Sequence, residues 1–227
     1  MMNYGKICTV MFISANLLAA NDPDDANKYL NFQDRYAPEN IDIELVFDSN
    51  FGETITRYEK EGNKFKIINQ SDKFLYVQEF TQDDNGVYLT DSQQDIDIFW
   101  FITSSATVKY LTPALQVPKP LKEDQEWKWS GYQDIDGDTV QLDITGKVIG
   151  EEIIELPAGE FETLHIELIV DLEGGERSTV NQWFAEGLGT VKLHALIEDP
   201  GIVGLAMKIF GFDEVYFNLK DVRHINK

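Results

Sequence analysis

Apolar and polar side chains alternate residue by residue along most of the chain, and this alternation limits the fold more than any other feature. It runs through residues 41–48, 139–144, 163–170 and 214–220. A period of two places successive side chains on opposite faces of a strand, so that one face packs on a core and the other meets water. The pattern predicts antiparallel β-sheet.

Glycine-containing turn sequences separate the alternating runs, as in residues 84–86, 136–138 and 173–175. Asn-Gly and Asp-Gly supply the positive φ angles that tight hairpins need. We expect about eleven strands joined mostly by short hairpins into a meander, with a further strand near the C-terminal end. These strands lie near residues 41–48, 53–60, 63–70, 73–82, 86–92, 97–103, 125–133, 138–149, 161–172, 177–186 and 189–196, and the further one near 213–220.

This alternating pattern leaves few segments that could form helices. Short helices are expected only near residues 22–32 and 202–210, and residues 111–124, with three prolines, are expected to form an irregular link. Strands that do not alternate with long amphipathic helices argue against doubly wound and barrel α/β enzymes. The sequence therefore predicts one all-β domain, a single strongly curved antiparallel sheet resembling a half-barrel, with one or two short helices on its concave face.

The N-terminal segment has the layout of a secretory signal peptide. Lys6 precedes a mostly apolar run of 14 residues, 7–20, which ends in Ala19-Ala20 before a polar, acidic stretch. Crossing a bilayer takes about 20 apolar residues, so this run predicts no membrane span. A buried first strand or helix is the alternative. We expect a signal peptide at 1–20, a single domain at 21–227, and a periplasmic or secreted protein. Cys8 lies at the start of the apolar run, whereas a lipid-modified cysteine would follow it, so no lipid anchor is expected.

Charge and residue counts exclude several function classes. The chain carries 40 acidic and 19 basic residues, a net charge of −21, with one cysteine and three histidines. A nucleic-acid partner would need a basic face, and a disulfide scaffold or cysteine zinc site would need more thiols. No phosphate-binding glycine loop and no serine-nucleophile motif occurs. We therefore expect no cofactor, no metal and no enzymatic activity.

Two weaker functional signals each have a simpler structural explanation. His165 and Glu167 share one strand face and could act as a base and its orienting group, but a solvent-facing pair is the simpler interpretation. Asp134, Asp136 and Asp138 have calcium-loop spacing, but Thr139 and Thr145 stand where such a loop needs Gly and Glu. A hairpin turn is the better interpretation of that segment.

Three stretches carry a resemblance to known proteins: Trp127-Lys128-Trp129 at a strand entry, a Pro-Ala-Gly-x-Phe-x-Thr turn at residues 157–163, and a Trp-Phe-x-x-Gly-x-Gly-x-Val-Lys hairpin at 183–192. In this order they resemble a group of exported bacterial β-proteins of uncharacterised function. The resemblance implies a strongly bent sheet similar to that of the lipoprotein-carrier proteins of the bacterial envelope. It implies no catalytic residue, because the motif positions are turn glycines and core aromatics. Trp127, Trp129 and Trp183 are expected to anchor the core.

The segment 201–212 is apolar without a period of two, and Lys208 is its only charged residue. It predicts a helix that either plugs the concave side of the sheet or covers a lipid-sized cavity. The first hypothesis is therefore a non-enzymatic envelope protein that binds an apolar small molecule, such as a lipid or acyl chain. The second is a structural or protein-interaction module with a filled core, whose partner would be another envelope protein. The candidate ligand-binding residues are Trp127, Trp129, Leu205, Met207, Ile209 and Phe210.

Overall fold

The computed structural model describes residues 29–30, 42–99, 102–198 and 213–225. All the regular elements in these ranges are strands. They are β1 (Tyr29–Leu30), β2 (Ile43–Ser49), β3 (Gly52–Glu61), β4 (Lys64–Gln70), β5 (Phe74–Asp83), β6 (Gly86–Phe99), β7 (Ile102–Pro118), β8 (Leu121–Lys122), β9 (Glu126–Ile135), β10 (Asp138–Leu156), β11 (Gly159–Leu172), β12 (Arg177–Ala185), β13 (Gly189–Glu198) and β14 (Glu214–His224).

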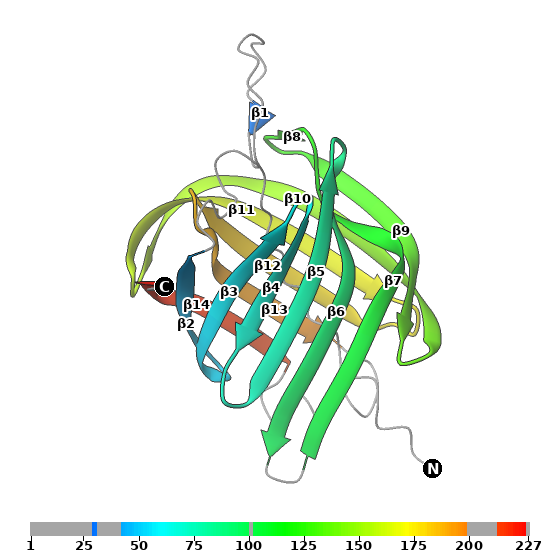
Figure 1. The fold of residues 1–227 in the computed structure, drawn as a ribbon. Coiled ribbons are helices and arrows are strands. Elements are labelled where there is room, and N and C mark those ends of the chain that lie inside the picture. Colours follow the sequence, from blue (N-terminus) through cyan, green and yellow to red (C-terminus); the bar gives the residue numbers. More distant parts are fainter. Residues whose placement is uncertain (1–28, 31–41, 100–101, 199–212, 226–227) are drawn as a thin grey trace.

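Twelve of these strands form one closed antiparallel barrel in the order β10-β11-β12-β13-β14-β2-β3-β4-β5-β6-β7-β9, and β1 pairs with β8 in a separate two-stranded sheet. In Figure 1, β3–β7 form the near wall and β10–β13 the far wall. The closure lies at β9, which pairs with β10 on one side and, through Gln133–Ile135, with Val108–Tyr110 of β7 on the other. The amide of Asp136 extends this junction by donating to the carbonyl of Thr107 at 3.2 Å.

The expected half-barrel with helices on its concave face is therefore wrong. An open sheet would leave two rows of unpaired amides and carbonyls, and the three residue pairs between β9 and β7 join these two edges. The closed barrel also differs from the bent sheet implied by the resemblance to lipoprotein-carrier proteins. Of the two expected helices, 202–210 lies outside the described residues. So does most of 22–32, whose described part, Tyr29–Leu30, is a strand.

The strand pattern matches the expectation except between residues 93 and 124 and at the end of β10, which runs to Leu156 instead of ending near residue 149. The structure continues β6 to Phe99 and begins β7 at Ile102, so the expected strand at 97–103 spans the ends of two strands. The expected irregular link at 111–124 is largely the second half of β7. Pro113 is tolerated in β7 because the pairing with β6 passes from Lys109 directly to Ala114, so Pro113 itself has no partner on β6. A residue without an amide hydrogen fits where the ladder is interrupted.

The turns follow the sequence chemistry. In the β9–β10 hairpin, Asp136 and Gly137 both have positive φ, 52° and 97°, and the Gly137 amide donates to the Asp134 carboxylate at 3.0 Å. This is a tight hairpin, as expected. Gly187 and Gly189, in the hairpin between β12 and β13, also have positive φ, 68° and 78°.

Aromatic rings fill part of the interior where β2 turns into β3. Phe51, in that turn, stacks on Phe74 of β5 with ring centroids 4.8 Å apart. Phe74 in turn lies 6.3 Å from Phe217 of β14, and Phe47 of β2 lies 5.9 Å from Phe217. Since β5 and β14 are four strand steps apart, about 19 Å along the wall, Phe74 and Phe217 meet across the barrel interior. We call Phe47, Phe51, Phe74 and Phe217 the aromatic plug.

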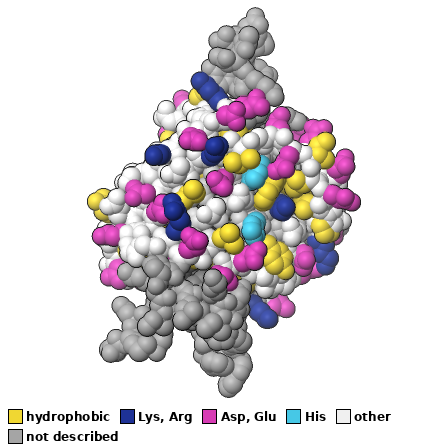
Figure 2. Space-filling model, turned by 180° about the vertical axis from the view of Figure 1, so that it is seen from behind, with side chains coloured by type: hydrophobic (Ala, Val, Ile, Leu, Met, Phe, Trp, Pro, Cys, Tyr) yellow, Lys and Arg dark blue, Asp and Glu magenta, His cyan; other side chains and the backbone are white. Residues whose placement is uncertain are grey.

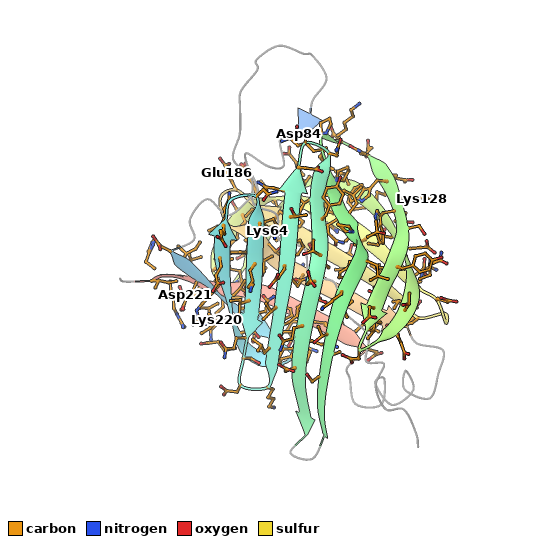
Figure 3. The ribbon with its side chains drawn as sticks, turned by 45° about the vertical axis from the view of Figure 1, so that its right-hand side comes forward. Lys64, Asp84, Lys128, Glu186, Lys220 and Asp221 are labelled. Carbon is orange, nitrogen blue, oxygen red and sulfur yellow. The ribbon has the colours of Figure 1, made fainter. Side chains whose placement is uncertain are left out.

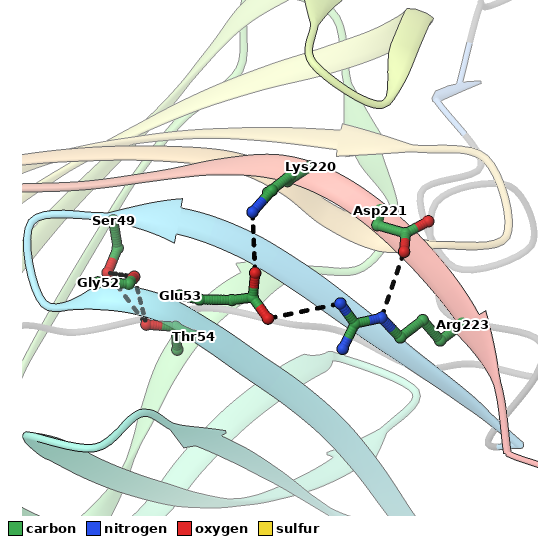
Figure 4. A network of polar contacts seen from close by, with 7 residues as sticks. All are labelled: Ser49, Gly52, Glu53, Thr54, Lys220, Asp221 and Arg223. Carbon is green, nitrogen blue, oxygen red and sulfur yellow. Dashed lines mark hydrogen bonds and ion pairs between the residues drawn. The ribbon is translucent and has the colours of Figure 1, made fainter.

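An ion-pair network on the outer face joins β14 to β3 across β2 (Figure 4). The Glu53 carboxylate lies 2.8 Å from Lys220 Nζ and 3.4 Å from Arg223 Nη2. Asp221 lies 3.2 Å from Arg223 Nε. The hydrogen bond and positive charge of Lys220 are the main causes that lower the pKa of Glu53, and Arg223 adds to them.

This network predicts a defined pH dependence of stability. Because the Glu53 pKa is lower in the folded state than in the unfolded chain, its stabilising effect is present above the ordinary value of 4.5 and is lost as the pH falls through the folded pKa. The difference in unfolding free energy between the wild type and Glu53→Gln, from urea denaturation, should be constant from pH 7 to about pH 5 and shrink below about pH 4.5. A difference that stays constant down to pH 3 would contradict the assignment.

Candidate functional site

One wall of the barrel interior is mostly apolar. Along β10–β14 and β2, the inward side chains are mostly aliphatic or aromatic and are buried, with Ser49, Ser178 and Gln182 as buried polar exceptions. The apolar ones include Leu142, Ile144, Val148, Leu164, Ile166, Leu168, Val180, Phe184, Leu193, Val215, Leu219 and Leu45. This wall could contact a hydrocarbon chain without leaving polar groups unsatisfied.

The opposite wall carries polar side chains at inward positions. We call this set the polar strip; it contains Thr56 of β3, Asn69 of β4, Gln78 of β5, Ser92 and Gln94 of β6, and Gln133 of β9. Strand register forms two neighbouring pairs among them, Thr56 with Asn69 and Gln78 with Ser92. All six are buried, and each takes an inward position that apolar residues occupy elsewhere along its strand.

Several atoms of the polar strip have no hydrogen-bond partner among the residues that the structure describes. Thr56 Oγ1 donates to Asn69 Oδ1 at 2.6 Å, but Asn69 Nδ2, both amide atoms of Gln78, and Gln133 Nε2 are buried and unpartnered within that part of the chain. Leaving a buried amide without a partner costs about 1–3 kcal/mol per group. Groups of this kind require bound water or a ligand to satisfy them.

The interior is also uncharged. Within the described ranges, the buried polar residues are serine, threonine, asparagine and glutamine, without a carboxylate, lysine, arginine or histidine. Burial raises the pKa of the Tyr110 hydroxyl, so Tyr110 stays neutral at physiological pH. Charged residues lie outside instead: Lys128 and Lys220 point away from the barrel at opposite sides of the view in Figure 3.

The two tryptophans expected in a ligand site lie on the inner face of β9. Trp127 is 7% exposed and packs flat over Gly146 of the paired strand β10, where any Cβ would overlap the indole ring. Trp129 is half-buried and covers Gly131 in the same way. Trp127 Nε1 has no acceptor within the described ranges. A binding role for both stays a prediction, and Leu205, Met207, Ile209 and Phe210 lie outside the described residues.

Trp183 lies on the outer face of β12, half-buried, rather than inside the core. It stacks on His165 with centroids 4.2 Å apart, its Nε1 donates to Glu152 at 2.6 Å, and Lys192 Nζ lies 4.3 Å from its ring centre. Histidine and apolar side chains gather among acidic groups on the face seen in Figure 2. The indole is therefore held between its neighbours on the outer surface.

The partner of His165 is not Glu167. Its Nδ1 lies 3.1 Å from Glu152 Oε1 and its Nε2 lies 2.8 Å from Asn181 Oδ1. Glu152 comes from β10, beyond a bulge near Gly150 that shifts the register against β11. Sequence spacing within one strand could not reveal a partner on the neighbouring strand. Both imidazole nitrogens are occupied in this arrangement, which suits a structural role.

A groove of about 790 Å³ lies where the ends of β3 and β4 meet β5 and β6. Its lining is mostly lysines and carboxylates, and Lys66 Nζ lies 2.9 Å from Glu79 Oε1 within it. This hydrogen bond and the charge of Glu79 raise the pKa of Lys66. The charges of both signs make the groove a poor site for an apolar ligand.

The described residues contain neither a metal-binding cluster nor a helix that could span a membrane. In the ranges that the structure covers, no three histidine, cysteine or carboxylate side chains are arranged to hold a metal ion. None of the described segments forms a helix with the length and apolarity needed to cross a membrane.

Comparison with known proteins gives structural likeness only. No family model matches the chain, and no curated protein matches it. Three solved structures resemble it: a predicted exported protein with a YmcC-like fold from Bacteroides fragilis, the hypothetical lipoprotein YmcC from Escherichia coli, and a predicted lipoprotein from Parabacteroides distasonis.

The three likenesses are distant. The TM-scores are 0.44, 0.40 and 0.41 and the sequence identities 9%, 10% and 11%, in the same order. The matches cover 83%, 90% and 83% of this chain and 99%, 92% and 98% of the other chains. At these scores the likeness assigns neither a fold family nor a function to this chain.

Proposed function

We propose that this chain is an exported, non-enzymatic envelope protein that binds a lipid or acyl chain inside its barrel. The observation that carries the proposal is the mostly apolar wall of β10–β14 and β2 enclosed within a twelve-stranded barrel. An eight-stranded barrel is just wide enough for side chains to fill or for one small ligand. Twelve strands enclose more space, and larger barrels commonly hold ligands.

Export is supported by the N-terminal sequence. Residues 1–20 carry a basic start, an apolar run and small residues before an acidic stretch, as secretory signals do. The mature chain would begin near Asn21 and would contain no cysteine.

The second candidate is a structural or interaction module, and the aromatic plug favours it. Phe74 and Phe217 meet across the interior, so this part of the barrel is filled by the protein's own rings. If side chains filled the whole interior in this way, the barrel would have no room for a ligand.

Native mass spectrometry of protein purified from its own envelope separates the two candidates. The binding protein should carry added mass that disappears on denaturation, and extraction should return an acyl compound. A native mass equal to that of the polypeptide, together with no uptake of a twelve-carbon acyl probe, would contradict the binding proposal and favour the filled module. N-terminal sequencing of the same material should read from near Asn21, and an intact Met1 would contradict export.

A further inference from the structure

We propose that the groove over β3–β6 binds a small zwitterion, a molecule that carries an ammonium group and a phosphate or carboxylate group a few bonds apart. The proposal goes beyond the proposed function, because the charged side chains of the groove point outward and the site needs no space inside the barrel. The groove measures about 790 Å³, a volume typical of small-molecule sites. Its lining combines lysines, carboxylates and threonine hydroxyls, so it offers partners to charges of both signs.

The negative end of the groove consists of Glu79 of β5 and Asp91 of β6. The two carboxylates are directly opposite in register, which is unfavourable because like charges repel. Lys66 neutralises only one of them, since its Nζ lies 2.9 Å from Glu79 Oε1. Asp91 has Lys109 opposite it on the other side, but the two form no ion pair in the described chain. An ammonium group bound between the two carboxylates would remove their repulsion.

A β-bulge at the groove sets this pairing. Thr90 is the extra residue of β6, because Glu79 pairs with Asp91 whereas Phe80 pairs with Leu89. Thr90 Oγ1 donates to the Glu79 carbonyl at 3.0 Å and so spans the bulge. Bulges redirect side chains and are common next to functional sites. The bulge is therefore a second feature, independent of the charges, that singles out this part of the wall.

The positive end of the groove lies farther along β5. Lys64 of β4, labelled in Figure 3, is directly opposite Thr81 of β5. Lys64 forms no ion pair in the described chain, although Glu61 of β3 lies opposite it. The Thr81 hydroxyl accepts from Asn63 Nδ2 at 3.5 Å, so its own proton is available for donation. An ammonium group and a hydroxyl donor side by side suit a phosphate or carboxylate oxygen.

The distance between the two ends defines the size of the ligand. Glu79 and Thr81 are two residues apart on β5 and lie on the same face, about 7 Å apart along the strand. A molecule whose ammonium and anionic groups are joined by a short carbon chain spans this distance. A molecule with a single charge would reach only one end. Glycerophosphoethanolamine, which has a phosphodiester and a primary ammonium, is therefore a suitable probe.

Titration followed by nuclear magnetic resonance tests the proposal with three soluble probes. The isotope-labelled full chain, purified from its envelope, is titrated with glycerophosphoethanolamine, with glycerophosphoglycerol, which lacks the ammonium, and with ethanolamine, which lacks the phosphate. We expect the zwitterion to shift the backbone amide signals of β4–β6 and to bind at least about fivefold more tightly than either other probe. Equal affinities for the three probes, or shifts confined to other strands, would overturn the proposal.

Asp91→Asn and Lys64→Gln test the two ends of the groove separately. Each should weaken glycerophosphoethanolamine binding at least about fivefold while the melting temperature stays that of the wild type. Asp143→Asn in β10 and Lys128→Gln in β9 are matched controls, because they make the same charge changes on exposed side chains outside the groove. The controls should leave the affinity within about twofold. Equal weakening by the controls would indicate a general charge effect and contradict the proposal.

Vesicles distinguish a lipid headgroup from a soluble compound as the source of the zwitterion. Sedimentation of the wild type, but not of Asp91→Asn, with vesicles of phosphatidylethanolamine and phosphatidylglycerol would identify a headgroup. Binding of the soluble probe without sedimentation would identify a soluble zwitterion, and both results support the site. Binding of neither the probe nor the vesicles would overturn the proposal, and it would leave acyl binding inside the barrel unaffected.

Discussion

Replacing Trp127 by alanine is expected to lower the free energy of unfolding by about 3–5 kcal/mol. The indole is 7% exposed and fills the space above Gly146, where β9 and β10 pair. Removing it takes away a large apolar contact and leaves a cavity that the paired backbones cannot close without breaking their ladder. Urea denaturation of the wild type and the variant measures the loss. A loss below about 1 kcal/mol would mean that the ring stabilises the fold little, and would favour a binding role.

Gly146 supplies the control for this result. Gly146→Ala alone should cost about 1–3 kcal/mol, because the added Cβ overlaps the indole of Trp127. In a chain that already carries Trp127→Ala, the same change should cost much less, since the ring is gone. Additive losses in the double variant would show that the two residues do not share one packed site.

Replacing Phe217 by alanine is expected to cost a similar amount, about 3–5 kcal/mol. Phe217 is 3% exposed and contacts both Phe47 and Phe74 in the aromatic plug. Its loss removes contacts within one wall and across the interior. Thermal and urea denaturation should both show the destabilisation.

The contact across the barrel can be isolated by combining Phe217→Ala with Phe74→Ala. Because the rings touch, the combined loss should be smaller than the sum of the single losses by more than about 0.5 kcal/mol. Leu196→Ala, on the same wall but 45% exposed, should change stability by less than about 0.5 kcal/mol. Strictly additive losses for the phenylalanines would contradict their contact across the interior.

Most strands were predictable because alternation is a local property of the sequence. The barrel closure was not, since it depends on Val108–Tyr110 meeting Gln133–Ile135, residues with ordinary strand composition that are distant in sequence. The second half of β7 was missed for a different reason. Prolines normally argue against a strand, and only the interrupted register before Ala114 makes Pro113 acceptable.

The candidate site, too, was predictable from the sequence only in part. The two-residue spacing of Trp127 and Trp129 correctly predicts a shared face, now seen to be the inner one. The polar strip was missed, although the sequence contains a signal for it. Asn69 follows Phe65 and Ile67 at alternate positions, and Gln78 follows Phe74 and Tyr76 in the same way. An amide in phase with core residues marks a polar group in the interior.

The pairing between β7 and β9 is the shortest ladder in the barrel. It contains three residue pairs, whereas β10 and β11 pair along most of their length. Local opening needs less free energy where fewer paired groups must separate. A gap between these two strands would connect the interior to solvent through the side of the wall. Under the proposed function, the residence time of a bound acyl compound would then depend on how often this junction separates, and two ligands of equal affinity could still leave at rates set by the protein.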